Sequence, residues 1–339
     1  MRDRCHRRAG GGTRRAWRAA GATGRLLAFL ALASPAGVSR LGAAEKAGAE
    51  SPPPPRWERP PELHSASRMF ESWKARVPPR PLLGGIHYVG TSGIAVYLIA
   101  TPAGHILIDT SFDDTVPHVL AGIAQLGFDA KDIKLILSSH AHVDHVGGHA
   151  RLQRHTGATI VASAADARLL ASGGADDFSP FPLQLMRYAP VTADRIVTDG
   201  ETVSLGGITL TAHLTPGHTA GATTWSTTVR HAGRVYAVVF LSSLSLVSGT
   251  RLLRNPRHPE LVADYEQTFR RLAAMSCDVF FGFHVSPRLD ELTAARGPNP
   301  FHDGETGWQA QLTAAERAFR EQLAAERQAG EANPPRATH

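Results

Sequence analysis

The sequence predicts an α/β fold in which sheets and helices stack as a layered sandwich. Short runs of β-branched and aromatic residues recur along the chain, which is typical of strands. Between them lie segments whose apolar residues repeat at helical spacing. Hydrophobic residues make up 42% and charged residues 19% of the 339 residues. This composition excludes a collagen-like, coiled-coil or wholly disordered chain.

Residues 1–44 have the features of a cleavable secretory signal peptide. Arg residues precede an apolar run at residues 26–33, and small residues follow at 42–44. The apolar run is too short to span a bilayer as a helix. We therefore expect cleavage after Ala44, a periplasmic mature protein and no membrane segment after cleavage. An uncleaved membrane anchor is the alternative.

The positive charge of the chain belongs to this leader. The whole sequence has a net charge of +6, but residues 1–44 contain nine Arg and one Asp. Residues 45–339 contain 27 basic and 29 acidic side chains, a net charge of −2. We therefore expect no nucleic-acid partner. Cys277 is the one cysteine after the leader, which excludes an internal disulfide and a Cys-rich zinc site in the mature chain.

The mature chain divides into two parts. Residues 45–66 are rich in Pro and predict a flexible arm. Residues 67–339 predict a single domain, with a long irregular loop at 172–191. We expect strands at 86–89, 95–99, 106–109, 133–137, 159–161, 208–213, 235–241 and 278–281. We expect helices at 115–126, 147–156, 163–171, 259–275 and 310–329, the last of them charged, Ala-rich and packed on the outside.

The most informative run is His140-Ala141-His142-Val143-Asp144-His145. It directly follows a strongly apolar predicted strand. Four coordinating side chains within six residues converge on a small volume only if a metal holds them. Several His with one carboxylate suit Zn²⁺. The alternative is a solvated His-rich turn, which would have no reason to follow a buried strand.

Two further histidines lie where predicted strands end. His218 follows the strand at 208–213, and His284 follows the strand at 278–281. Functional groups in open α/β folds gather at strand ends. Six ligands from three such loops are enough for two zinc ions with three protein ligands each. Three ligands leave a position open for water, which is typical of a catalytic zinc site.

The run from His140 to Gly148 resembles the signature loop of the metallo-β-lactamase fold superfamily. Several later stretches resemble subclass B3 metallo-β-lactamases: Thr211–His213, Pro216–Thr219, Thr224-Trp225, Asn255–Arg257 and Cys277–His284. The resemblance covers roughly residues 68–305 and implies a four-layer αβ/βα sandwich. It also implies the ligand sets. His140, His142 and His218 would bind the first zinc, and Asp144, His145 and His284 the second.

The segment after the strand at 235–241 distinguishes the subclass B3 pattern from other enzymes of the same superfamily. Zinc lactonases and glyoxalase II-like enzymes carry a metal-bridging Asp there, and subclass B1 and B2 lactamases carry a zinc-binding Cys. This chain has Ser242-Ser243-Leu244-Ser245, which is similar to the B3 pattern. The resemblance implies that Ser243 or Ser245 hydrogen-bonds the substrate carboxylate. The alternative is that these serines only end a strand.

The resemblance implies hydrolysis of the β-lactam amide of antibiotics by a metal-bound hydroxide that Asp144 orients, and hence antibiotic resistance. It implies two Zn²⁺ per chain and a small-molecule substrate, and we expect a monomer. No Gly-x-Ser-x-Gly or complete Ser-x-x-Lys signature supports a covalent intermediate. The alternatives are a hydrolase of the same fold acting on a lactone, thioester or phosphoester, a non-catalytic metal-stabilised binding protein, and a nucleic-acid-processing enzyme.

Overall fold

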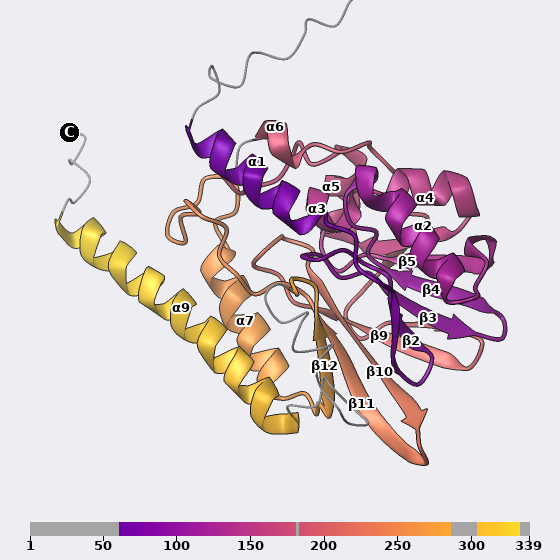
Figure 1. The fold of residues 1–339 in the computed structure, drawn as a ribbon. Helices are drawn as coiled ribbons and strands as arrows, with labels where there is room; N and C mark the ends of the chain where they lie inside the picture. The colour runs from indigo at the N-terminus through magenta and orange to yellow at the C-terminus, as the bar shows by residue number, and fades with distance from the viewer. Residues whose placement is uncertain (1–60, 181–182, 286–303, 333–339) are drawn as a thin grey trace, which may run out of the picture. The chain divides into compact units, whose positions relative to one another are not determined.

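The structure is a computed structural model that describes residues 61–180, 183–285 and 304–332 (Figure 1). All of these residues belong to one compact unit, Pro54–His339. The predicted leader and residues 45–60 of the predicted arm lie outside the described residues. No helix within the described ranges is long and apolar enough to cross a membrane.

Two β-sheets form the centre of the fold. The first has the strand order β1 (Arg80–Leu83), β2 (Ile86–Tyr88), β3 (Tyr97–Thr101), β4 (Gly104–Ile108), β5 (Ile133–Leu137), β6 (Thr159–Ser163) and β7 (Arg195–Val197). The second has the order β12 (Val279–Gly282), β11 (Arg234–Leu241), β10 (Thr223–His231), β9 (Ile208–Leu214) and β8 (Thr202–Leu205). Strands β4 to β7 are parallel to one another, so their carboxyl ends meet at one edge.

The main core lies between the two sheets. Alternate residues of each strand point into it, as the period-two geometry of strands requires. Tyr97 of the first sheet and Trp225 and Phe240 of the second are buried there, and the Tyr97 and Phe240 ring centroids are 5.3 Å apart. This shared core fixes the position of one sheet against the other.

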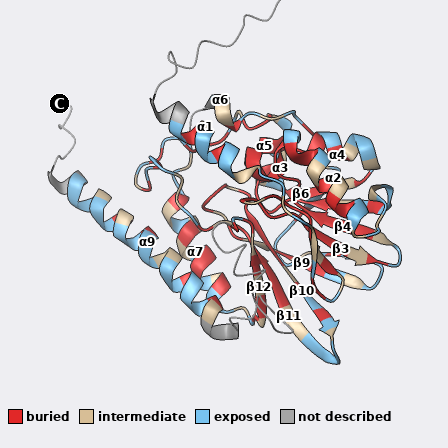
Figure 2. Cartoon of the chain, in the orientation of Figure 1, coloured by how far each residue is buried: buried red, intermediate tan, exposed pale blue. Residues whose placement is uncertain are grey.

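Helices cover the outer face of each sheet (Figures 1 and 2). Helices α2 (Val116–Gln125), α4 (His149–Thr156) and α5 (Ala164–Ala171) pack on the first sheet. Helices α7 (Leu261–Ala273) and α9 (Gly304–Ala332) pack on the second. Helix α9 buries Trp308, Leu312, Phe319 and Leu323 along one face. The four-layer αβ/βα sandwich implied by the resemblance is confirmed, and α9 packs on the outside as expected.

Several short elements differ from the sequence-based expectations. Helix α1 (Pro61–Trp73) begins inside residues 45–66, so the last part of that segment is helical and not an arm. Proline is favoured in the first turn of a helix because the N–H it lacks has no partner there. The short helix α6 (Leu183–Met186) lies within the loop predicted at 172–191. Strand β10 was not predicted because seven of its nine residues are Thr, Ser, Arg or His, which leaves few apolar residues to mark it.

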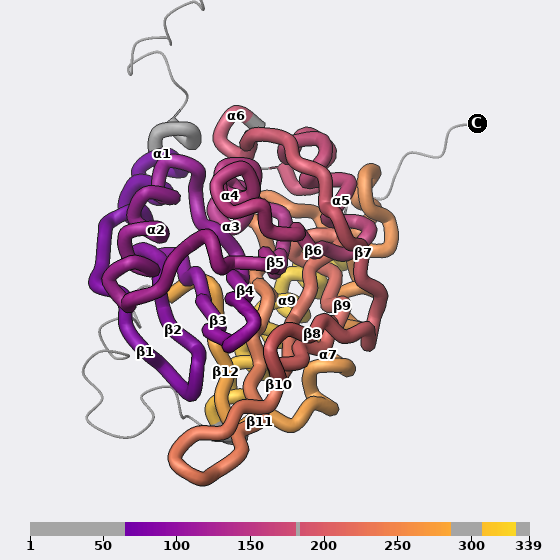
Figure 3. The backbone as a smooth tube through the Cα atoms, turned by 90° about the vertical axis from the view of Figure 1, so that its right-hand side faces the viewer, coloured from indigo at the N-terminus to yellow at the C-terminus, as the bar shows by residue number. Residues whose placement is uncertain are grey.

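The ligand-bearing loops lie at one end of the sandwich. Val143, next to the predicted ligands, packs with Phe70 of α1 and Met186 of α6. Figure 3 shows α1 and α6 at one end of the molecule and the turn between β10 and β11 at the opposite end. The remaining short helices are η2 (Asp113–Thr115), η3 (Ala130–Asp132) and α3 (Val143–Val146).

Candidate metal centre

The first ligand loop follows the buried end of β5. Helix α3 is a single turn that begins after His142, so the loop folds back at once. His140, His142, Asp144 and His145 are all buried. Burying three imidazoles and a carboxylate is costly unless each gains a partner. The loop is therefore not the solvated His-rich turn considered as the alternative.

The other two predicted ligands come from the second sheet. His218 lies in the turn between β9 and β10. His284 lies two residues after the end of β12 and forms an isolated β-bridge with Ile94, which lies in the segment between β2 and β3. Gly217 has a φ of 141°, and a Cβ there would lie 2.9 Å from the Tyr265 ring. Only glycine allows the turn to pass Tyr265 this closely. The ligands therefore lie where the two sheets meet.

Asp144, His145 and His284 form the first of two compact donor groups. Asp144 Oδ2 lies 3.1 Å from His145 Nε2 and 3.5 Å from His284 Nε2. The two imidazole nitrogens are 3.1 Å apart. Donors bound at about 2.0–2.1 Å around a tetrahedral zinc ion are separated by about 3.3 Å. The three atoms thus fit one zinc ion.

His140, His142 and His218 form the second group, with ligand atoms within 4.8 Å of one another. Their ring centroids are 4.6 to 5.2 Å apart. His140 Nε2 is buried and has no hydrogen-bond partner among the described residues. A buried nitrogen without a partner is unfavourable, and coordination to a metal ion would satisfy its lone pair. The neutral donor set suits zinc.

The nitrogens that face away from the ligand groups are held by neighbours. His218 Nδ1 donates to the backbone oxygen of Ser245 at 2.7 Å, because a carbonyl can only accept. His140 Nδ1 lies 3.1 Å from Ser139 Oγ. Such bonds fix the ring orientation and leave the Nε2 lone pairs for a metal.

Asp109 is a functional residue that the sequence analysis missed. It follows β4 with a φ of 61° and is fully buried. Its Oδ2 lies 3.1 Å from His145 Nδ1 and accepts a hydrogen bond from Ser139 Oγ, while its Oδ1 accepts one from the Ser139 backbone N–H. Burial raises the pKa of Asp109, and the bonds from His145 and Ser139 oppose that shift. A carboxylate ending an otherwise apolar run was the available sequence signal.

Asp177, in the predicted irregular loop, supports His142. Its Oδ2 lies 2.9 Å from His142 Nε2, and both side chains are buried. Burial alone would raise the pKa of Asp177, but His142 and Ser179 together lower it below its ordinary value. His142 therefore presents Nδ1, and not Nε2, to the other histidines.

Asp166 connects the two ligand loops. Its buried carboxylate accepts hydrogen bonds from Thr219 Oγ1 at 3.2 Å and from the backbone N–H of Ala141. Ser163 caps α5 by accepting from the Asp166 N–H and donates its own hydroxyl to the Gly221 oxygen at 2.7 Å. Burial raises the pKa of Asp166 to about 7. The start of α5 thus ties the His140 loop to the His218 turn.

The ionisation of the donors is set by burial and by their neighbours. Burial lowers the pKa of His218 to about 3 and that of His284 to about 4. Burial would also lower the pKa of His145, but the carboxylates of Asp144 and Asp109 raise it to about 10. Metal ligation needs the neutral imidazole. His145 must therefore lose a proton before it can bind an ion.

Asp144 is held in its ionised form. Burial alone would raise its pKa, but the adjacent His145 and His284 rings lower it below the ordinary range. The ionised carboxylate is the form that binds a metal.

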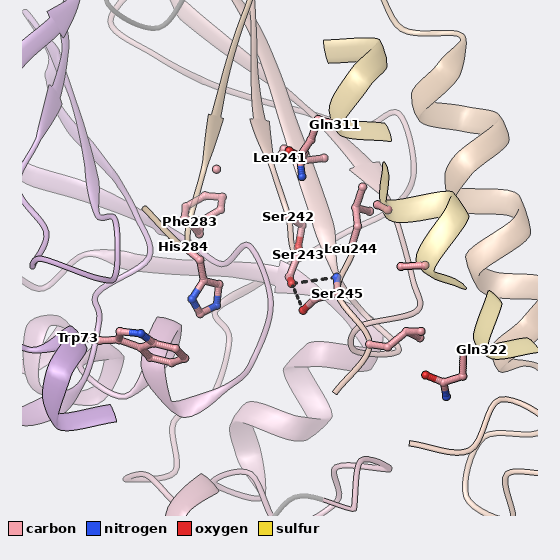
Figure 4. Close-up of a pocket in the computed structure, with 14 residues that line it drawn as sticks. Trp73, Leu241, Ser242, Ser243, Leu244, Ser245, Phe283, His284, Gln311 and Gln322 are labelled. Carbon is pink, nitrogen blue, oxygen red and sulfur yellow. Dashed lines mark hydrogen bonds between the residues drawn. The ribbon is translucent and has the colours of Figure 1, made fainter. Parts of the chain in front are cut away.

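The structure places Ser243 and Ser245 beside the metal centre. Both line a pocket of about 720 Å³ that also reaches His284 and Trp73 (Figure 4). Their hydroxyl oxygens are 3.0 Å apart. Ser242 has a different position, since it is buried and its hydroxyl donates to the Ser139 backbone oxygen. Ser243 and Ser245 are thus available to a molecule bound in the pocket, whereas Ser242 joins the two sheets.

Helix α1 brings one aromatic residue to the same site. The Trp73 ring lies edge-on to the His284 ring, with centroids 4.9 Å apart. Phe70 and Phe112 pack beneath it, with ring centroids 5.4 Å apart. The N-terminal helix thus forms one wall beside the exposed ligand His284.

Comparison with protein families shows a match over this region. The model of the Metallo-beta-lactamase superfamily matches residues 89–284, more than half of the chain. That range contains all six predicted ligands.

Two curated relatives are hydrolases of different descriptions. The chain is 26% identical over 195 residues to Thioesterase pkgB of Emericella nidulans, covering 53% of this chain and 49% of that protein. It is 29% identical over 121 residues to a probable metallo-hydrolase of Burkholderia pseudomallei, covering 34% and 37%. The chain spans about half the length or less of these two proteins.

Solved structures match more of the chain. FEZ-1 of Legionella gormanii has a TM-score of 0.72 and 35% identity, covering 75% of this chain and 98% of its own. A metallo-β-lactamase of Cronobacter sakazakii has a TM-score of 0.72 and 39% identity, covering 76% and 99%. The subclass B3 enzyme BJP-1 of Bradyrhizobium japonicum has a TM-score of 0.71 and 38% identity, covering 77% and 98%. The chain belongs to the metallo-β-lactamase superfamily, and its structural neighbours include the subclass B3 enzyme BJP-1.

Proposed function

We propose that this protein is a zinc-dependent β-lactamase that opens the β-lactam ring of antibiotics and so confers resistance. The observation that carries the proposal is the pair of adjacent three-donor groups at the meeting edge of the two sheets. Similarity to three proteins named metallo-β-lactamases, over three quarters of the chain, supports the substrate class. We assign two zinc ions per chain, one to each donor group.

Zinc bound in such a site lowers the pKa of water toward about 7 and polarises a carbonyl oxygen. The chain's own groups position the reactants. Asp144, fixed by His145 and His284, accepts a hydrogen bond from the attacking water. The C–O bond forms as the ring C–N bond breaks, and the proton of the water passes to the ring nitrogen. Ser243 and Ser245 donate hydrogen bonds to the substrate carboxylate.

Thioester hydrolysis is the second candidate, because one relative of the chain is named a thioesterase. The segment after β11 favours the β-lactam assignment. It contains Ser242 and Ser243 where the resemblance places a metal-bridging Asp in glyoxalase II-like enzymes.

The test is hydrolysis of a chromogenic cephalosporin, a carbapenem, an acyl thioester and a lactone by the purified mature protein. Metal content is measured on the same sample, and each assay is repeated after chelation. We expect chelator-sensitive β-lactam turnover with close to two zinc ions per chain. Turnover of the thioester or lactone without any β-lactam turnover would overturn the assignment.

A further inference from the structure

The pocket beside the metal centre continues away from it, as far as helix α9. His284 and Trp73 lie at one end, Ser243 and Ser245 lie in the middle, and α9 forms the far wall (Figure 4). Gln311, Ala315, Ala318 and Gln322 of α9 line that wall. Their spacing of three and four residues places them on one stripe of the helix. We call this space the α9 pocket.

The wall formed by α9 is fixed in place. Its neighbouring face is buried against the second sheet and α7. Gln322 donates a hydrogen bond to the Thr250 backbone oxygen at 2.7 Å. The Glu326 carboxylate accepts from the backbone N–H groups of Leu252 and Leu253 at 2.9 and 2.8 Å. The helix is thus bonded to the segment that follows the serine loop, and the pocket is preformed.

The lining of the α9 pocket has no Asp, Glu, Lys or Arg among the described residues. Its carbon surface comes from residues such as Leu244, Leu246, Phe283 and Ala315. At the α9 wall, beyond the two serines proposed to bind the substrate carboxylate, a charged group would lose hydration without gaining an oppositely charged partner, which is unfavourable. An aryl or alkyl group would instead bury apolar surface. The end of the pocket against α9 therefore selects an uncharged apolar group.

We propose that the α9 pocket binds the uncharged apolar side group of the substrate whose reacting bond lies at the metal centre. The pocket and the centre share His284, and the two serines lie between that ligand and α9. A volume of about 720 Å³, shared between the serine end and the α9 end, accommodates the substrate carboxylate together with an aryl substituent on the adjacent ring carbon. Helix α9 is then a specificity-determining element. The β-lactam identity of the substrate rests on the proposed function, whereas the chemistry of the pocket does not.

The first experiment fills the pocket. Ala318→Phe adds a ring on the pocket stripe, and Ala324→Phe is the control, since both alanines are exposed and position 324 lies about 240° further around the helix. The substrates are a cephalosporin with an uncharged aryl-bearing substituent on the ring carbon next to the carboxylate-bearing carbon, and the same cephalosporin with hydrogen there. For Ala318→Phe we expect kcat/KM to fall about tenfold on the aryl-substituted cephalosporin and to stay within about twofold on the unsubstituted one. Equal changes on both substrates, or the same pattern in the control, overturn the inference.

The second experiment reverses the preference. Ala318→Arg places a cation beside the side group, and Ala324→Arg is its control. The kcat/KM for a cephalosporin with a carboxyl group on that aryl substituent, relative to the uncharged parent, is expected to rise about tenfold in Ala318→Arg only. An unchanged ratio contradicts the assignment. Zinc content and thermal unfolding midpoints are measured for all four variants, so that a folding defect is recognised.

A binding measurement separates failure of the pocket from failure of the proposed function. The probe is Nile red, an uncharged dye that fluoresces in apolar sites. If the wild-type protein hydrolyses no β-lactam, the β-lactamase assignment fails. The pocket still stands if the dye binds the wild type and Ala324→Phe and binds Ala318→Phe at least about tenfold more weakly. Equal dye affinity in all three proteins overturns the pocket.

Discussion

The carboxylate of Asp109 lies 3.1 Å from His145 Nδ1, and both side chains are fully buried. The contact turns the other nitrogen of the ring, Nε2, toward Asp144 and His284. Asp109 also accepts two hydrogen bonds from Ser139, whose hydroxyl contacts His140. The Asp109 carboxylate thus orients His145 of the Asp144 group directly, and it orients His140 of the other group through Ser139.

Replacing Asp109 tests this relationship. Asp109→Asn keeps the size of the side chain but removes its charge. We expect zinc affinity at the Asp144–His145–His284 group to fall about 10- to 100-fold, because a ligand loses its orienting partner. Competition with a chromophoric chelator measures the two affinities. Asp113→Asn, at an exposed acid nearby, is the control. Equal affinities in Asp109→Asn and the wild type would show that His145 is oriented by other contacts.

Replacing Asp166 is expected to affect the His140 loop and the His218 turn together. Asp166→Ala leaves the Ala141 N–H and the Thr219 hydroxyl without their acceptor. We expect a loss of about 1–3 kcal/mol in unfolding free energy and weaker zinc binding by the three histidines. Urea unfolding with and without zinc measures both effects. Asp176→Ala, at an exposed position in the same region, is expected to change neither.

His149 gives a pH dependence that is independent of the metal. Its ring is fully buried between Thr110 and Ser138 hydroxyls, and burial lowers its pKa to about 3. The unfolded chain binds a proton below about pH 6.5, whereas the folded chain does not, so stability is lost as the pH falls from 6.5 to 3. In His149→Gln, the unfolding free energy is expected to fall less steeply with decreasing pH, by about 1 kcal/mol per pH unit. Urea unfolding of chelated protein from pH 4 to 8 measures it, with the exposed His155→Gln as the control. Equal slopes of unfolding free energy against pH below 6.5 in His149→Gln and the wild type would rule out this role.

Zinc binding is expected to release a proton from His145. Its pKa of about 10 means that the metal-free ring is protonated at neutral pH. Affinity at the Asp144 group should therefore rise about tenfold per pH unit through the neutral range. Titration calorimetry in two buffers of different ionisation enthalpy counts the protons released. A pH-independent affinity would contradict the assigned charge.

The leader prediction is tested by secretion. Full-length protein expressed in a Gram-negative host is expected to appear in the periplasm with a new N-terminus close to residue 45. Deletion of the apolar run at residues 26–33 should retain the precursor inside the cell. N-terminal sequencing of the periplasmic fraction and size-exclusion chromatography check the cleavage site and the expected monomer. Recovery of the intact chain in the membrane fraction would favour the uncleaved anchor.

The grouping of the six candidate donors could be predicted from the sequence, because each follows a recognisable strand and four of them lie within six residues. The supporting carboxylates could not. Asp109 contacts His145, and Asp166 contacts Thr219, through chain reversals that no local pattern encodes. Strand β10 was hidden for a different reason. Seven of its nine residues are Thr, Ser, Arg or His, so its average hydropathy is low, although Thr223, Thr224 and Trp225 are buried in this central strand.

The placement of the donors on both sheets affects how long the protein survives. In the proposed two-zinc form, an ion held by His140, His142 and His218 would join the first sheet to the second, and an ion held by Asp144, His145 and His284 would do so again. Each is a reversible cross-link between distant parts of the chain, which stabilises the folded state in proportion to the logarithm of the free zinc concentration. Zinc depletion would therefore do more than stop turnover. It would raise the population of opened molecules, which proteases of the compartment could then degrade.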